Sequence, residues 1–396
     1  GQGWSLDSEL LDVSGNDLLA SFSQTGEDTQ DLIPKLDTLT EQIDSFLKEA
    51  EEVAEVRTGQ LKANMSESWT GLDLERNLTG LASADVTGDG NTEMILVDAD
   101  SVLIYRVRDR RLERLEEIEA PSHTNPIAVD AGDVNDDGTA GIFVTAQNNA
   151  GSMLRSFVLQ YRDGRFRRIL ENSPWFYRVA GEQDILLGQR HSREGDPFEP
   201  QVVRLEPKNR EFEPSGQFLS RAEDINVLGL ALGRGGVGGE SMAAALDGRG
   251  RLRLLDPEGR ALWTTSEKYG GSNLYMQGPE MGQGSGRERF FLPGRVTLLA
   301  RPHRGPQVLT LRQEGWFGVQ TNRMRTFESG RIVSLGWDGQ ELAEQWKTRS
   351  YEGHLRDLTL GDLNGDGNLE LAVLWLKSQG AWFIQPESRV IILPLQ

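Results

Sequence analysis

The sequence predicts an all-β protein built from repeats, and three observations support this prediction. Three short acidic loops recur along the 396 residues, at 85–93, 133–141 and 362–370. Each loop is followed by a short apolar run rich in β-forming residues, at 94–97, 142–145 and 371–376. The chain also contains 45 Gly, which suits frequent turns between short strands. A motif that recurs at intervals of tens of residues indicates a repeat architecture.

The three loops share a register of oxygen-bearing side chains that suits a hard cation. Positions 1, 3 and 5 carry oxygen, position 7 most simply offers its carbonyl, and two of the loops add Glu at position 9. Position 6 is Gly90, Gly138 or Gly367, because glycine tolerates the positive φ of a sharp turn. The candidate ligands are Asp85, Thr87, Asp89, Asn91 and Glu93 in loop one, Asp133, Asn135, Asp137 and Thr139 in loop two, and Asp362, Asn364, Asp366, Asn368 and Glu370 in loop three.

Calcium is the predicted cation, because it takes roughly six to eight oxygens in a flexible shell, whereas magnesium demands near-octahedral geometry. Loops one and three each supply three carboxylates. Loop two supplies two, because its position 9 is Gly141, so its site is predicted to be weaker or completed by water. An EF-hand is excluded, since position 12 is Leu96, Val144 or Val373 in place of a bidentate Glu. The alternative is that all three loops are Asp/Asn/Gly turns without a metal.

The pattern D-x-[DNT]-x-D-G-x-x-E before an apolar strand resembles the FG-GAP/VCBS repeat, the calcium-loop blade of integrin-α-like β-propellers. From about Trp69 to its end, the chain is similar to bacterial VCBS-repeat envelope proteins, with segments such as 186–190 and 269–273 carrying the likeness. The resemblance implies a β-propeller that places each loop between the first two strands of a blade and binds partners. Segments 232–240 and 299–307 stand where further acidic loops belong but cannot hold a metal. Packing alone is therefore expected to hold the middle blades.

Residues 1–66 differ in pattern from the rest and are expected to form a separate ββα segment. Alternation at 5–13 and 17–24 predicts two strands joined by a turn at 14–16. From about Thr29, apolar residues recur at three- and four-residue steps, which predicts a helix. This unit resembles the second half of the TolB-N/CsgG-like domain, and a hairpin and helix packed on the propeller edge is the alternative. The expected domains are 1–66 and 67–396.

The spacing of two tryptophans predicts how the ring closes. Trp69 and Trp346 each lie 16 residues before the first Asp of an acidic loop. The segment after 355 supplies three evident strands, so the strand near Trp69 is expected to complete the last blade and leave no free sheet edge. Six blades are predicted, with seven as the alternative. The predicted spans are 79–120, 126–172, 183–219, 226–266, 290–349 and 355–396 with the strand near Trp69.

Aromatic, glycine-rich and arginine-rich segments also predict local structure. The aromatic run at 175–177 is interpreted as packing between blades, and the glycine-rich stretches 233–239 and 278–286 as loops. The Arg-rich segment 106–114 alternates with acids and is predicted to be an exposed strand pair and turn.

Charge, hydropathy and the acidic loops bear on the partner, on membrane insertion and on the location of the protein. The net charge of −19 argues against nucleic acid as a partner. No apolar run approaches the ~20 residues of a membrane span. Weak calcium loops need the high calcium found outside the cytosol, so the periplasm, outer membrane or cell surface is the expected location, with an export signal upstream of Gly1.

The sequence gives no signal for catalysis, and the protein is expected not to be an enzyme. Its four His are scattered, and no G-x-S-x-G elbow occurs. The leading function is a non-catalytic, calcium-stabilised β-propeller that serves as a protein–protein interaction or scaffold module in the bacterial cell envelope. The alternatives are a carbohydrate-binding, lectin- or lyase-like propeller and an integrin-like surface adhesin. Trp316 and Trp382, in expected loops, are the candidates for exposed glycan contacts.

Overall fold

The computed structural model divides into two compact units, Gly1–Leu61 and Lys62–Gln396. It describes residues 4–11, 18–26, 34–40, 42–43, 68–192, 195–209, 211–235, 240–280, 287–299, 306–315, 325–377 and 387–395. In the first unit, β1 (Trp4–Leu11) pairs antiparallel with β2 (Leu18–Gly26), and residues 34–40 are helical. The expected turn at 14–16 and the expected helix beyond residue 43 lie outside the described residues. Within the described residues, no helix is long and apolar enough to cross a membrane.

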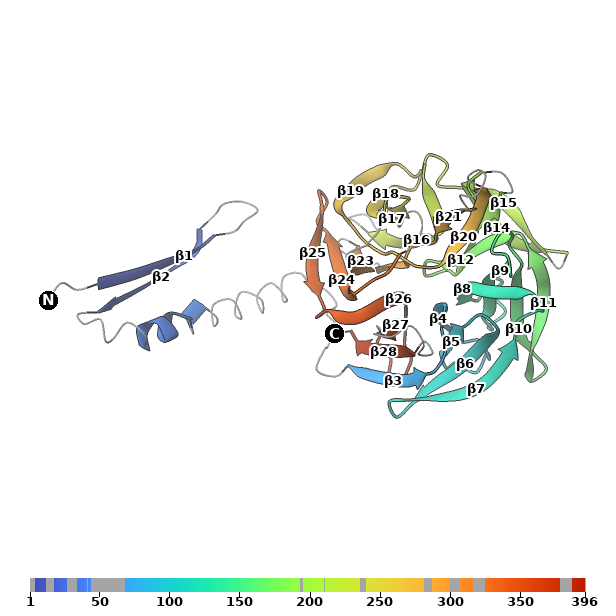
Figure 1. Cartoon of the computed structure of the whole chain (residues 1–396), viewed down its shortest axis with the longest axis horizontal. Helices are drawn as coiled ribbons and strands as arrows, with labels where there is room; N and C mark the ends of the chain where they lie inside the picture. The colour runs from blue at the N-terminus through green and yellow to red at the C-terminus, as the bar shows by residue number, and fades with distance from the viewer. Residues whose placement is uncertain are drawn as a thin grey trace. The chain divides into compact units, whose positions relative to one another are not determined.

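The second unit is an all-β propeller, a ring of antiparallel sheets around a common centre (Figure 1). Four separate four-stranded sheets follow one another in chain order. Their strands are β4 (Gly80–Ala84), β5 (Glu93–Val97), β6 (Ser101–Arg108), β7 (Arg111–Glu119), β8 (Thr124–Gly132), β9 (Gly141–Asn148), β10 (Ser156–Arg162), β11 (Arg165–Ser173), β12 (Trp175–Ala180), β13 (Ile185–His191), β14 (Phe198–Lys208), β15 (Glu211–Phe218), β16 (Ile225–Gly235), β17 (Glu240–Asp247), β18 (Arg251–Leu255) and β19 (Ala261–Lys268).

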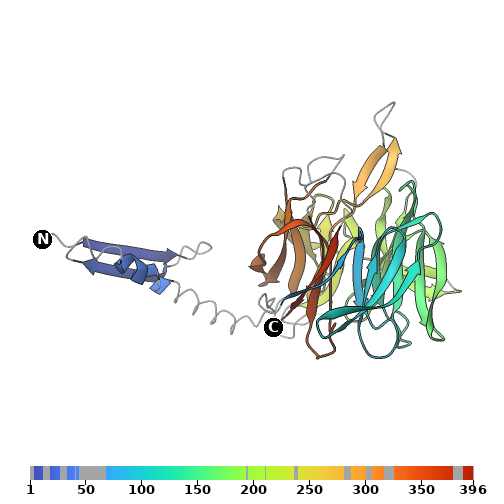
Figure 2. The ribbon, with the colours of Figure 1, turned by 60° about the horizontal axis from the view of Figure 1, so that its bottom comes forward.

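The rest of the ring is one eight-stranded sheet, and a separate hairpin stands out from the ring (Figure 2). The hairpin is β20 (Tyr275–Glu280) and β21 (Arg287–Phe291). The large sheet runs β22-β23-β24-β26-β27-β28-β3, with β25 also on β24. Its strands are β22 (Val296–Leu299), β23 (Gln307–Glu314), β24 (Ser329–Trp337), β25 (Leu342–Lys347), β26 (Tyr351–Gly361), β27 (Glu370–Lys377), β28 (Ser388–Pro394) and β3 (Trp69–Leu74). The first strand of the unit thus pairs with its last, which joins the two ends of the chain.

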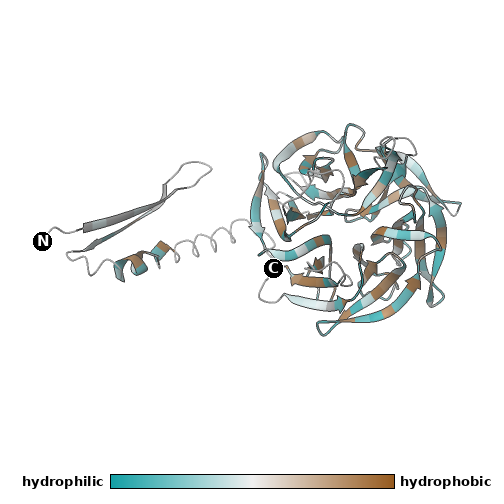
Figure 3. Cartoon of the chain, in the orientation of Figure 1, coloured by the Kyte–Doolittle hydropathy of each residue, from teal (hydrophilic) through white to brown (hydrophobic). Residues whose placement is uncertain are grey.

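Hydrophobic burial follows the position of each strand within its sheet. All five residues of β5, the second strand of its sheet, are buried, whereas β7 alternates between exposed and half-buried residues. Figure 3 shows the corresponding alternation of teal and brown along the outer strands. Between neighbouring sheets, side chains such as Ile95, Val129 and Phe157 form a shared apolar cluster. The sheets therefore adhere to one another through their faces, as blades of a propeller do.

The innermost strands form a closed circle of contacts. In order they are β4, β8, β12, β16, β22 and β26, and β26 returns to β4. A buried ionic network crosses this circle. Arg178 of β12 pairs with Asp130 of β8 at 3.5 Å, and Arg295, just before β22, pairs with Asp130 at 2.7 Å and with Asp357 of β26 at 2.6 Å. All four side chains are at most 10% exposed.

The same network also reaches backbone groups of the remaining inner strands. Arg178 donates to the carbonyls of Leu230 in β16 (2.7 Å) and Val296 in β22 (2.8 Å). Asp357 accepts the amide of Leu81 in β4 at 2.9 Å. Burial, together with Arg295, lowers the pKa of Arg178 to about 10. Burial also opposes the charge of Arg295, but Asp130 and Asp357 outweigh it and raise the pKa of Arg295.

Two sequence predictions are wrong. The third sheet begins with β12 at Trp175, and not at 183, because the aromatic run is itself an inner strand and ends in a short turn with no acidic loop. Of the two stretches predicted to be loops, residues 233–235 and 278–280 lie in β16 and β20, and residues 236–239 and 281–286 lie outside the described residues. A Cβ at Gly233 would lie 2.0 Å from Leu298 Cδ2, and one at Gly278 would lie 2.4 Å from Phe290 Cε2. These glycines admit close neighbours and do not mark turns.

The buried His354 generates a prediction about acid stability. Its ring stacks on Phe327, and Nε2 lies 3.3 Å from the carbonyl of Gly271. Burial, with a contribution from the charge of Arg356, lowers the pKa of His354 to about 3. The unfolded chain therefore binds a proton below about pH 6.5 that the folded chain does not, so stability falls as the pH falls from about 6.5 towards 3.

Urea unfolding at pH 7 and pH 5 checks this prediction. Between these values His354 is expected to cost the wild type about 2 kcal/mol, a loss that His354→Phe should remove. Equal pH dependence in the two proteins would show that His354 does not titrate in this way.

Candidate functional site

The three acidic loops lie side by side at one end of the ring. Each connects the first and second strands of its sheet: β4 to β5, β8 to β9, and β26 to β27. Because β26, β4 and β8 are neighbours, loop three lies next to loop one, and loop one lies next to loop two. The amide of Ala140 donates to the carbonyl of Asp85 at 2.9 Å, and the hydroxyls of Ser83 and Thr359 lie 2.9 Å apart. The fold thus gathers segments that are far apart in sequence.

A common hydrogen-bond pattern shapes the loops. In loop three, Asp362 at position 1 accepts the amides of Gly365, Asp366 and Gly367, at 2.8, 3.0 and 2.9 Å. Asp85 makes the same three bonds in loop one, and Asp133 makes the last two in loop two. The glycine at position 6 has a positive φ in all three loops, at 84°, 83° and 88°, as the sequence predicted. The carboxylate at position 1 is therefore the main acceptor for the backbone amides of each turn.

Loop one holds a guanidinium group among its carboxylates. Arg106 of β6 donates from Nε to Glu93 Oε1 at 2.9 Å and from Nη2 to Asp89 Oδ2 at 2.7 Å, and Nη2 also contacts Glu93. Glu93 is completely buried. The prediction that segment 106–114 is an exposed strand pair is correct for the strands and turn but wrong for Arg106, which is only 14% exposed at its side chain.

Loop two holds amide side chains in the corresponding space. Asn135 and Gln160 both donate to Asp137 Oδ2, at 2.8 and 3.0 Å. No carboxylate stands at position 9, where Gly141 lies next to the ring of Phe143. The backbone amide of Asp133 donates to Asp184, from the short turn of the next sheet, at 2.8 Å. Loop two therefore has two carboxylates at the predicted ligand positions, Asp133 and Asp137, and both accept hydrogen bonds.

Loop three combines three carboxylates with no cationic side chain contact in the described part of the chain. Glu370 is buried, and its Oε2 accepts the amide of Leu363 at 2.8 Å. The amide nitrogen of Asn364 donates to Glu370 Oε1 at 3.0 Å and to Asp366 Oδ2 at 3.1 Å. A 180° turn of that amide would direct its oxygen towards these carboxylates, at the cost of the bond in which Asn364 Oδ1 accepts the backbone amide of Asp366 (2.8 Å). Loop three is thus the loop whose donor set fits a cation best.

The residue opposite loop position 9 on the third strand explains these differences. Glu93 pairs across the sheet with Arg106, and Glu370 pairs with Pro394. In the second sheet, the pairing of Leu159 with Ile142 places Gln160 at the equivalent point. Sequence reasoning missed Arg106 because it treated each loop alone. The pairing of the third strand with the second could have revealed it, because it places Arg106 opposite Glu93.

Burial and local hydrogen bonds set the pKa values in the loops. Burial raises the pKa of Glu93 and of Glu370 above the ordinary range. The backbone amide of Asn368 lowers the pKa of Asp366, and the side chain of Asn91 lowers that of Asp89. As the side chains stand, no group of three or more His, Cys, Asp or Glu among the described residues is arranged to hold a metal ion.

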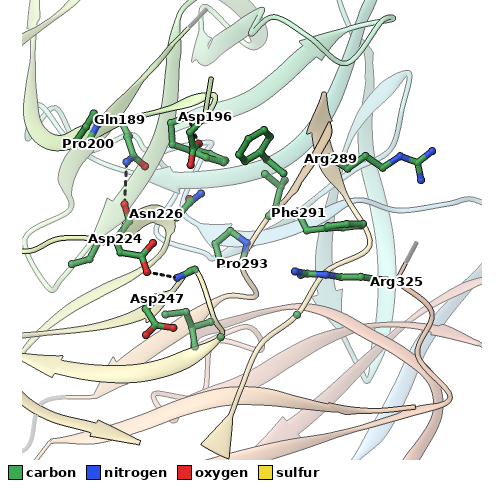
Figure 4. Close-up of a pocket in the computed structure, with 18 of the residues that line it drawn as sticks. Gln189, Asp196, Pro200, Asp224, Asn226, Asp247, Arg289, Phe291, Pro293 and Arg325 are labelled. Atoms are coloured by element: carbon green, nitrogen blue, oxygen red, sulfur yellow. Dashed lines mark hydrogen bonds between the residues drawn. The ribbon is translucent and has the colours of Figure 1, made fainter. Parts of the chain in front are cut away.

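The opposite end of the ring carries a pocket of about 490 Å³ (Figure 4). It lies where β16 begins and β17 ends, beneath the hairpin β20–β21. Arg325 and Phe291 lie on one side, with the guanidinium 4.3 Å from the ring centre, and Asp224 lies on the other side. Burial lowers the pKa of Arg325 and raises that of Asp196. The sequence did not predict this pocket, since its walls come from six separate segments. Trp316, Trp382 and His303 lie outside the described residues.

Comparison with known proteins supports the repeat assignment for one part of the chain. The family model of the FG-GAP-like repeat matches residues 85–144, which contain loops one and two. No curated protein matches the sequence.

Several solved structures resemble the chain at low sequence identity. The PQQ-bound aldose sugar dehydrogenase from Streptomyces coelicolor is 13% identical, with a TM-score of 0.42, over 85% of this chain and 98% of that one. BBS1N in complex with ARL6DN is 12% identical, with a TM-score of 0.41, over 83% of this chain and 97% of that one. The apo soluble aldose sugar dehydrogenase from Escherichia coli is 10% identical, with a TM-score of 0.38, over 82% and 99%.

Proposed function

We propose that this chain is a non-catalytic, calcium-stabilised β-propeller that serves as a protein–protein interaction or scaffold module. The observation that carries the proposal is loop three. There, Glu370 is buried, Asn364 links it to Asp366 of the same turn, and no basic side chain among the described residues neutralises these carboxylates. A buried carboxylate such as that of Glu370 is costly without a counter-charge, and a bound cation removes that cost. In this proposal calcium stabilises the fold, and the partner protein binds to a different surface.

We count six blades in this proposal, by treating β22–β25 and β26–β28 with β3 as separate units. The two runs meet through the pairs Ser329–Glu352 and Gly330–Tyr351. Their inner strands, β22 and β26, contact the neighbouring inner strands as those of the other sheets do. Among the described strands of the ring unit, those left over are β20 and β21, which form the projecting hairpin.

The three loops are proposed to differ in their use of calcium. In loop three, Asp362, Asn364, Asp366, the carbonyl of Asn368 and Glu370 would hold the ion. In loop one, Arg106 already neutralises Asp89 and Glu93, so calcium must displace the guanidinium and binds more weakly. Loop two lacks a carboxylate at position 9, so calcium is also proposed to bind more weakly there.

The proposed location is the bacterial envelope, in the periplasm or at the cell surface. Weak calcium sites fill only where calcium is abundant. Fractionation of native cells tests this location. Recovery of the protein in the cytosol would contradict it.

The proposed contact surface is the end that bears the hairpin and the pocket. Arg289 stacks over Tyr275 at 4.6 Å, and Phe290 and Phe291 line the pocket with Arg325. Aromatic and arginine side chains dominate the energy of protein interfaces. The same pocket favours a second candidate, a glycan, because aromatic rings and carboxylates such as Asp196 and Asp224 are typical partners of sugar rings and hydroxyls.

Thermal unfolding with EDTA and then with excess calcium tests the metal proposal. Calcium at 100 times its Kd is expected to add about 2.7 kcal/mol to the free energy of unfolding, with a corresponding rise in Tm. Glu370→Gln should abolish most of the shift, and the matched change Glu93→Gln should retain it. Arg106→Met, which frees Asp89 and Glu93, should enlarge it. An unchanged Tm in the wild type would refute the calcium proposal.

Cross-linking in native cells and a glycan array together test the binding proposal. A protein cross-linked to the wild type should be lost with Arg289→Glu on the hairpin and retained with Arg111→Glu on the outer strand β7. Glycan binding that depends on Arg289, with no protein cross-link, would favour the second candidate.

A further inference from the structure

A small polar cavity lies among the inner strands of the ring. Its volume is about 30 Å³, which is room for about two water-sized particles. Its lining includes Ser272 and, around the inner strands, the polar residues Thr79, Asp130, Arg178, Arg295, Arg356 and Asp357. The latter residues come from β8, β12 and β26 and from the segments just before β4 and β22. The cavity therefore adjoins the ionic network that links the inner strands.

The charges around this cavity do not balance. Three guanidinium groups face two carboxylates. Asp130 and Asp357 are taken by Arg178 and Arg295. The third guanidinium, Arg356, is 5% exposed and bonds only neutral groups: Asn77 Oδ1 at 2.8 Å, Asn273 Oδ1 at 3.0 Å and the carbonyl of Leu78. A surplus of one positive charge in a buried site is expensive unless a counter-ion accompanies it.

Two buried polar atoms at the cavity also lack a partner among the described residues. They are Nε of Arg356, which is a donor, and Oδ2 of Asp130, which is an acceptor. Buried polar groups are almost always satisfied, so each points to an occupant. An anion satisfies the guanidinium donor. A water molecule satisfies the carboxylate oxygen, and the volume admits both.

We propose that the cavity binds one small monovalent anion of the chloride class, held by Arg356 and completing the charge balance of the inner ring. Monovalent charge matches the surplus of one. A phosphate or sulfate would exceed the cavity and bring a second charge. Consistently, burial lowers the pKa of Arg356 to about 9, and the charge of Asp357 offsets this only in part.

Thermal unfolding in sodium chloride and in sodium gluconate, at equal ionic strength and constant calcium, tests the proposal. Chloride should raise Tm by on the order of a few degrees and then saturate, because it binds the folded state alone. Gluconate is too large for the cavity, so it should not produce this saturating rise in Tm. Arg356→Gln should remove the chloride-specific shift. Arg389→Gln, at an ion pair on β28, is the matched control and should retain it. A shift of equal size in the Arg356 variant would overturn the proposal.

Crystals of the wild type grown in bromide give a second readout that does not depend on how the variants fold. An anomalous peak beside Arg356 Nε is the expected result. Ordered water alone in the cavity would overturn the proposal, whatever the calcium experiment shows.

Discussion

The buried chain of charges from Arg178 through Asp130 and Arg295 to Asp357 is the interaction on which the ring depends. Hydrophobic packing between sheets is non-directional and tolerates several ring sizes. Charge-assisted bonds from arginine have a fixed geometry and so define distances between strands. Through these four side chains, the inner strands β4, β8, β12, β16, β22 and β26 are each bonded to the network. Each carboxylate needs its guanidinium, since a buried charge left alone costs about 3–5 kcal/mol.

The remaining features divide between the two ends of the ring. At one end, β26, β4 and β8 carry the acidic loops: loop three belongs to the sheet in which β3 pairs with β28, and loops one and two belong to the two sheets that follow it. A cation in loop three would therefore stabilise the sheet that joins the two ends of the chain. At the other end, the hairpin and the 490 Å³ pocket expose aromatic and charged groups, and this end is better suited to recognition. In the proposed function, stability and binding thus depend on opposite ends of the ring.

The sequence predicts the parts of this structure that depend on local pattern. The acidic loops and the apolar strands after them come from spacing within one stretch of chain, and the place of Trp69 in the last sheet follows from its spacing to Asp85 and from the strand that this sheet otherwise lacks. Loop three differs from loop one through Pro394 and Arg106, which lie on third strands, so a motif alone predicts them to be equivalent. The ionic network was missed because Asp130 and Arg295 are 165 residues apart. One local signal existed, since Arg178 interrupts the otherwise apolar strand β12.

A double-mutant cycle between Arg295 and Asp357 tests the central claim most directly. The free energy of unfolding of the wild type, Arg295→Met, Asp357→Leu and the double variant would be measured in urea at constant calcium and chloride. If the network holds the inner strands together, each single change costs about 3–5 kcal/mol, and the double change costs clearly less than the two costs combined. Additivity to within about 0.5 kcal/mol would contradict the account, because it would mean that the two charges do not depend on each other.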